Sequence, residues 1–266
     1  SVEFNFLKDF FQITENATEI NGILEQIFQP TFQQALMYTE QILIDTTVLD
    51  IFGVLISIRI GQQLQMESIR RNTPVFDSYL NDQAILLWPK FQQLIDWQAE
   101  SLNNLSATSF NIDITTILAQ PHELTIAFTT FLQSLLTLSI NDSYDMKLYL
   151  KASDSVDEDI NLKDDDISNK FDPRSEPLYQ SIIRIRNSYE TIMTKFSKMT
   201  KSAENFLSIN YLYLYNSLQH HNLSQNISTS EDETTGDDEN NYKEIPIRKE
   251  MEFHFKTLVE AYNQNT

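Results

Sequence analysis

The sequence predicts an all-α fold, arranged as an elongated stack of antiparallel helical bundles. Glycine and proline are scarce, with 4 and 7 residues among 266, so turns are few and the elements should be long. Apolar residues recur at spacings of three and four along most of the chain, which is the period of an amphipathic helix. Long helices joined by short connections favour antiparallel packing.

The first long helical pattern covers residues 17–44. Pro30 lies inside it and removes one backbone hydrogen bond, so we expect a kink or a short break there. The next helix should run to about Arg70. Thr47 offers an N-cap for this helix, with Asp50 three residues later in the manner of a capping box.

A further helix is predicted from Pro74 to about Asn103, with the stretch "LLWPKF" in its middle. Trp88 directly precedes Pro89, which leaves two options open: a kink within one helix, or a new helix with Pro89 at its first position. In both options Trp88 and Phe91 anchor the bend by burial. Trp88, Pro89 and Phe91 form a predicted structural joint.

Pro121 opens another helical pattern, which fades at residues 141–145. The clearest pattern covers residues 178–206, where apolar positions follow the 4-3 spacing of a left-handed helix pair. No glycine or proline interrupts residues 178–221, so one continuous helix of about 65 Å is predicted. A last helix begins at about Pro246.

The net charge of −19 is concentrated in two runs. Residues 154–172 hold eight acids and two lysines, and residues 231–239 hold six acids and no base. Such a surface repels phosphate, which disfavours nucleic-acid binding. No apolar run reaches the length of a membrane span. The chain has no cysteine, so disulfides and thiolate chemistry are excluded.

These runs define the expected domain organisation. We expect three segments: a helical bundle with the Trp-Pro joint at 1–150, a mobile acidic loop at 151–175, and a long-helix bundle at 176–266 with an acidic insert at 222–242. The chain lacks an initiator methionine and begins inside an apolar pattern. We therefore expect it to be a fragment of a longer protein.

The sequence offers no motif for catalysis, for a cofactor or for a metal. It has no HExxH pair, nucleophile elbow, phosphate-binding loop or dinucleotide fingerprint. Asp157 begins a run that imitates a calcium loop, but Leu162 replaces the glycine and Ser168 the bidentate acid that such a loop needs. We therefore expect no enzyme, no catalytic residues, no cofactor and no metal ligands.

Two aromatic residues are candidates for contacts with a partner protein. Trp97 falls about 120° from the apolar stripe of its helix. Tyr211, Tyr213 and Tyr215 cannot share one helical face, and Tyr213 is the strongest exception to core packing. Packing inside the bundle is favoured for both candidates, and a partner contact stays open because exposed aromatics are enriched at interface hot spots.

Two segments carry a family resemblance. The first is "RNTPVFDSYLNDQAILLWPKF" at 71–91, with its basic, proline-containing break followed by Trp-Pro-Lys-Phe. The second is "ENFLSINYLYLYNSL" at 204–218, centred on Asn210 and Tyr211. Both resemble the vacuolar protein sorting-associated protein 52 family, a subunit of the GARP tethering complex and its endosomal variant. The fragment would come from the C-terminal half.

The resemblance implies a tethering-complex helical rod and a non-enzymatic function in endosome-to-trans-Golgi retrograde transport. Its implied partners are the other complex subunits, SNAREs and a Golgi Rab GTPase in its GTP form. The implied location is cytoplasmic, on the cytosolic face of the trans-Golgi network and endosomes, with peripheral membrane association through partners only. One alternative is a helical scaffold of exocyst or the conserved oligomeric Golgi complex. An all-helical enzyme ranks below it.

Overall fold

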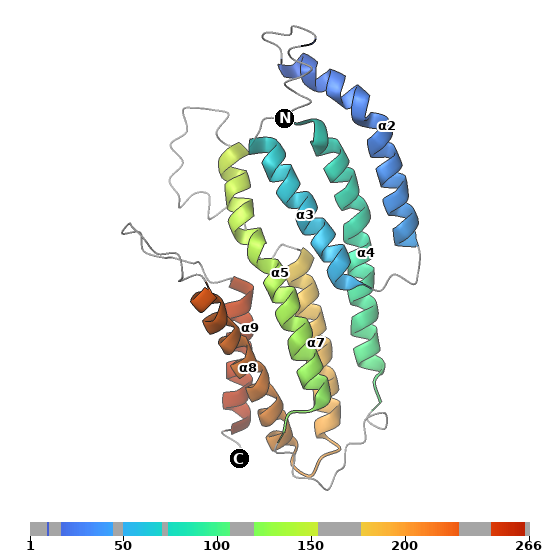
Figure 1. The fold of residues 1–266 in the computed structure, drawn as a ribbon. Helices are drawn as coiled ribbons and strands as arrows, with labels where there is room; N and C mark the ends of the chain where they lie inside the picture. Colours follow the sequence, from blue (N-terminus) through green and yellow to red (C-terminus); the bar gives the residue numbers. More distant parts are fainter. Residues whose placement is uncertain are drawn as a thin grey trace, which may run out of the picture. The chain divides into compact units, whose positions relative to one another are not determined.

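The computed structural model describes Phe10 and residues 17–44, 50–70, 74–106, 120–153, 177–228 and 246–263. Every regular element in these ranges is helical, which confirms the predicted all-α class (Figure 1). The elements are, in order, α2 Ala17–Ile44, α3 Ile51–Arg70, the 3-10 helix η1 Pro74–Phe76, α4 Asp77–Asn104, α5 Glu123–Ser153, α7 Pro177–Ser197, α8 Ala203–Ser228 and α9 Pro246–Asn263.

The chain divides into two compact units. The first comprises Ser1–Ile95 and Tyr144–Phe171, and the second comprises Asp96–Ser143 and Asp172–Thr266. Helices α4 and α5 each contribute residues to both units. The predicted acidic loop falls mainly on residues 154–176, and most of the predicted acidic insert on residues 229–245, both outside the described ranges.

Aromatic rings hold the first unit together where α2 meets η1. Phe32 stacks on Tyr79 with ring centroids 4.8 Å apart, and it also meets Phe76 edge to face at 5.7 Å. Leu24 and Val75 are buried beside this cluster. Apolar side chains at the i, i+4 spacing of α2 therefore bury against the turn that precedes α4.

Polar side chains join α3 to the start of α4. The Ser68 hydroxyl donates to the Asp77 carboxylate at 3.0 Å, and the Gln65 amide donates to Asn81 at 3.2 Å. Asp77 lies in the first turn of α4, where a negative charge complements the helix dipole. These bonds fix the angle at which the chain turns from α3 into α4.

Helix α3 begins at a different cap from the one predicted. The backbone N–H of Gly53 donates to the Asp50 carboxylate at 2.8 Å, so Asp50 is itself the N-cap. Thr47, which we had expected to cap this helix, lies outside the described residues. An aspartate can fill this position without help from a residue three places earlier, because its side chain reaches the third backbone N–H directly.

Neither internal proline ends its helix. Helix α2 continues through Pro30, and Figure 1 shows that it bends along its length. Helix α4 continues through Pro89, so of the two options for this joint the single helix is the one observed. Trp88 takes part in the helix despite the bias that a following proline imposes, because tertiary packing outweighs such local preferences.

The second unit is built from the end of α4, the part of α5 up to Ser143, and α7, α8 and α9. The predicted apolar seam of α7 is buried: Leu178, Ile182, Ile185, Tyr189, Ile192 and Phe196. Helices α8 and α9 pack against each other extensively. Tyr211 of α8 stacks between Phe255 and Tyr262 of α9, with centroid distances of 6.1 and 5.9 Å.

The prediction of one continuous helix over 178–221 is wrong, because α7 ends at Ser197 and α8 begins at Ala203. Hydroxyl groups end α7 in place of glycine or proline. The Thr200 N–H and hydroxyl both donate to the Ser197 carbonyl, at 3.1 and 2.7 Å. Side-chain bonds of this kind compete with helix continuation and satisfy the last carbonyls of the helix.

Helix α5 is longer than predicted. Its apolar pattern fades at residues 141–145, yet the helix runs to Ser153. The residues beyond the fading point include "MKLYLKA", which is rich in good helix formers and supports helix without a strong apolar face. Intrinsic propensity therefore extends this helix beyond its periodic signal.

Candidate protein-contact site

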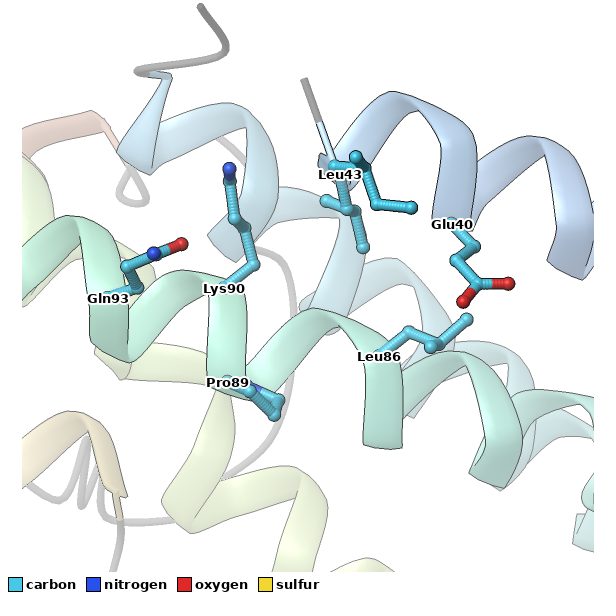
Figure 2. A pocket seen from close by; sticks show the side chains of 7 residues that line it. Glu40, Leu43, Leu86, Pro89, Lys90 and Gln93 are labelled. Atoms are coloured by element: carbon cyan, nitrogen blue, oxygen red, sulfur yellow. The ribbon is translucent and has the colours of Figure 1, made fainter. Parts of the chain in front are cut away.

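An open pocket lies in the first unit where the C-terminal end of α2 meets the middle of α4. Its volume is about 460 Å³. Its lining residues are Glu40, Leu43, Ile44, Leu86, Pro89, Lys90 and Gln93. Each helix presents one face to the pocket, because the lining positions follow the i, i+3, i+4 rule. Figure 2 shows the Glu40 side chain reaching from α2 toward Leu86 on α4.

Pro89 gives this pocket an unusual backbone. A helical residue at position 89 would normally donate its N–H to the carbonyl of Ile85, but proline has no N–H. The Ile85 carbonyl therefore keeps a lone pair that the helix does not use. An acceptor of this kind beside an apolar surface can receive a hydrogen bond from another chain.

Apolar and charged groups meet at this pocket. Leu43, Ile44 and Leu86 supply apolar surface, and Ile44 is 70% exposed. Glu40 lies exposed on one side, whereas Lys90 is only 7% exposed and buries most of its stem. An apolar floor with polar groups at its edge is the usual anatomy of a protein-contact pocket.

One residue of the predicted joint, Pro89, lies in the wall of this pocket. Phe91 is fully buried, and Trp88 is half-buried and meets Phe91 edge to face, with centroids 5.7 Å apart and planes at 82°. Pro89 is exposed and lines the pocket. The role of Trp88 and Phe91 as anchors of a bend stays a prediction.

The two candidate contact residues lie in the second unit. Trp97 is 36% exposed on α4, beyond the buried positions Leu94 and Ile95. Tyr213 is half-buried on α8, whereas its neighbour Tyr211 is buried in the stack with α9. Trp97 thus offers more surface to a partner than Tyr213 does.

A buried polar cluster in the second unit was missed by the sequence reasoning. Asn210 of α8 accepts hydrogen bonds from the His122 backbone N–H at 2.8 Å and from the Thr125 hydroxyl at 2.5 Å. Thr125 also bonds the Tyr189 hydroxyl at 2.9 Å. The Asn210 amide donates to the Phe206 carbonyl at 2.7 Å. The cluster therefore ties three helices, α5, α7 and α8, to one another.

The electrostatics of this cluster match a structural role. Burial raises the pKa of Tyr189 far above its ordinary value, so its hydroxyl keeps its proton. Burial lowers the pKa of His122, with the nearby Glu123 carboxylate opposing that shift. The His122 ring accepts a hydrogen bond from the Leu124 backbone N–H at 3.1 Å, which occupies the nitrogen that a general base would use. The cluster caps α5 and aligns the bundle.

The described residues contain neither a metal-binding cluster nor a membrane-spanning helix. No group of three or more His, Asp or Glu side chains in the described ranges is arranged to hold a metal ion. Among the same residues, no helix has the length and apolar character needed to cross a membrane.

The sequence carried a signal for the buried cluster, and only a weak one for the pocket. An asparagine in the apolar run "LSINYLYLY" predicts a buried amide that needs partners, and Asn210 is that residue. The pocket could be located only through Pro89. Its other wall comes from Glu40, Leu43 and Ile44, whose position beside α4 has no trace in the spacing of the chain.

These features define a class: an all-α protein of packed helices, cross-linked by buried polar side chains and carrying an open pocket. The family model described as "Vps52, C-terminal" matches residues 1–243. The chain therefore belongs to the Vps52 family, as the resemblance predicted.

Relatives in three organisms share this family. Vacuolar protein sorting-associated protein 52 of Saccharomyces cerevisiae is 49% identical over 288 residues, which cover 100% of this chain and 41% of the relative. The protein of the same name from Schizosaccharomyces pombe is 28% identical over 141 residues, covering 53% of this chain and 26% of the relative. Vacuolar protein sorting-associated protein 52 B of Arabidopsis thaliana is 33% identical over 92 residues, covering 34% of this chain and 12% of the relative.

The chain spans about two fifths of the length of the Saccharomyces cerevisiae relative, and a smaller share of the length of the other two relatives. No solved structure matches the chain significantly. Helix α9 lies beyond the last residue that the family model matches, although the yeast relative aligns with the whole chain.

Proposed function

We propose that this chain is part of a non-enzymatic subunit of a GARP-type vesicle-tethering complex, acting in endosome-to-trans-Golgi retrograde transport. The observation that carries the proposal is the match to the Vps52 family, which includes 49% identity to a vacuolar protein sorting relative along the whole chain. A fold of packed helices that buries its polar groups in structural cross-links supports a scaffold rather than a reaction site.

The proposal includes its partners and its location. The chain binds sibling subunits, SNAREs and a Golgi Rab GTPase in its GTP form, and it reaches the cytosolic face of the trans-Golgi network and endosomes through them. Two features support protein contacts: the open pocket at Pro89 and the exposed apolar stripe Ile56, Ile60 and Leu64 on α3. A stripe at i, i+4, i+8 suits a second helix packed along α3.

A pull-down against three sets of subunits tests the assembly. The chain is immobilised and offered the other GARP subunits, exocyst subunits, and subunits of the conserved oligomeric Golgi complex under identical conditions. Retention of the GARP subunits alone is the expected result. Retention of either other set, without the GARP subunits, would replace this proposal by the alternative of a different tether.

A second pull-down tests the Rab contact and the two aromatic candidates. The chain should retain the Golgi Rab when it is loaded with GTP but not with GDP. Trp97→Ala and Tyr213→Ala are compared with Leu212→Ala, an exposed apolar control on α8. Loss of retention at unchanged helicity would make either residue a contact. Equal retention on both nucleotides would end the Rab proposal.

A further inference from the structure

Arg248 in the first turn of α9 is a buried charge with no hydrogen-bond partner among the described residues. The residue is 3% exposed. Its three guanidinium nitrogens, Nε, Nη1 and Nη2, are buried and find no hydrogen-bond acceptor among the described residues. It contrasts with Arg184 on α7, whose guanidinium is exposed and pairs with Asp96. Within the part of the chain that the structure describes, the guanidinium donors of Arg248 therefore have no acceptor.

Such an arrangement is unfavourable in the isolated chain. Arginine does not lose its proton in proteins, so burial cannot neutralise it as it would a lysine. Burial lowers the pKa of Arg248, because the charged guanidinium loses its hydration. The nearby Glu252 carboxylate opposes that shift. A buried charge is retained where a counter-ion and hydrogen bonds compensate for its lost hydration.

The surroundings of Arg248 supply part of an anion site. Arg248 is the third residue of α9, where backbone N–H groups have no acceptor within the helix and the helix dipole is positive. Side chains on a helix commonly lean toward its N-terminus, a tendency that favours the guanidinium lying near that end. The neighbouring carboxylate of Glu250 is engaged elsewhere, because it accepts the Tyr179 hydroxyl at 2.6 Å.

From this geometry we infer that Arg248 and the first turn of α9 form a binding site for a carboxylate, supplied by an Asp or Glu side chain of a sibling subunit. The inference rests on the proposed function, because it needs a partner chain. It adds a defined contact on α9, which lies beyond the residues that match the family model.

The chemistry favours a protein carboxylate as the occupant. The planar guanidinium fork accepts both oxygens of a carboxylate at once, which gives direction as well as attraction. Apolar neighbours, Ile247 and Met251, are buried beside Arg248 on the same helix. A buried arginine framed by apolar side chains is the arrangement found at the centre of protein interfaces.

The isolated chain gives the first test. Arg248→Met removes an uncompensated charge and keeps the apolar stem, so the Tm should rise by about 2–4 °C. The matched control is Lys249→Met, at the exposed neighbouring position, which should leave the Tm unchanged. An unchanged or lower Tm in Arg248→Met would mean that the charge is already compensated within the chain, and would overturn the inference.

Acetate serves as a probe of the same site. Sodium acetate should raise the Tm of the wild-type chain and of Lys249→Met above the value in sodium chloride of equal ionic strength. Arg248→Met should show no such difference. A response to phosphate but not to acetate would overturn the carboxylate assignment.

Binding to the sibling subunits gives the second test. Arg248→Met and Arg248→Lys should each weaken retention of the GARP subunits at least tenfold, because lysine keeps the charge but loses the fork. Lys249→Met should bind as the wild-type chain does. Normal binding by Arg248→Met would refute the inference and leave the proposed function intact. If the wild-type chain binds no sibling, the proposed function fails, and the acetate test still decides whether the anion site exists.

Discussion

Tyr189 of α7 and Phe128 of α5 stack face to face, with ring centroids 4.0 Å apart and ring planes within 5° of parallel. The same tyrosine bonds Thr125 one turn earlier on α5. One side chain thus supplies both an apolar contact and a hydrogen bond between the same two helices. The two contributions can be separated by substitution.

Tyr189→Phe should keep the stack and lose only the hydrogen bond. We expect the free energy of unfolding to fall by about 1 kcal/mol, because Thr125 retains Asn210 as a second partner. Tyr189→Ala should cost about 3–5 kcal/mol, because it also opens a cavity. Urea unfolding of the three chains measures both values. Equal losses in the two variants would contradict this division.

Asn210→Ala should cost more than Tyr189→Phe. It leaves the His122 backbone N–H and the Thr125 hydroxyl without their shared acceptor in a buried place, which predicts a loss of about 2–4 kcal/mol. A double-mutant cycle with Thr125→Val measures the coupling directly. Strictly additive losses would show that the two residues do not act as one cluster.

The stability of the second unit should depend on pH through His122. Its pKa in the folded chain lies below the ordinary value of 6.5, so the unfolded chain takes up the proton first as the pH falls. The free energy of unfolding should therefore decrease as the pH falls below about 6.5, and should level off below the lowered pKa of the folded state.

His122→Asn tests this dependence, because asparagine keeps an acceptor for the Leu124 N–H and does not titrate. Unfolding curves of both chains are compared between pH 8 and pH 5. The wild-type chain should lose more stability over this interval than the variant does, since other titrating groups contribute equally to both. If both chains lose the same stability between pH 8 and pH 5, His122 is not the source of the pH dependence.

Pro89→Ala should make the chain more stable and less able to bind. Alanine restores the N–H that bonds the Ile85 carbonyl, which predicts a gain of about 1–3 kcal/mol. The same change removes a wall of the pocket and occupies the carbonyl acceptor, so retention of sibling subunits should fall. Ile85→Ala, at an exposed position outside the pocket lining, is the control for altered packing alone. Unchanged binding by Pro89→Ala would show that the pocket is not a contact.

The sequence predicts the faces of these helices better than their ends. The buried positions of α7 follow from their 4-3 spacing, because burial of one stripe is what the spacing selects. The break after Ser197 was not predictable from glycine or proline, since hydroxyl bonds at Ser197 and Thr200 end the helix instead. The contact between Trp88 and Phe91 follows from their spacing of three residues along one helix.

Sites made from distant segments could not be predicted in this way. The pocket needs α2 beside Pro89, and the buried cluster needs Asn210 beside the start of α5, and neither pairing is encoded in a local pattern. Arg248 was missed because its position in the first turn of a helix is ordinary. Its burial, with no acceptor in the described ranges, is what distinguishes it.

The division of the second unit into two separate stretches of chain has a consequence for its biosynthesis. Residues Asp96–Ser143 are synthesised before any residue of Asp172–Thr266 exists. The acceptor that His122 needs is made 88 residues later, a delay of roughly 4–18 s at ordinary rates of elongation. During this interval the apolar face of α5 has no permanent cover. We therefore expect the nascent chain to be a client for chaperones until α7 and α8 emerge.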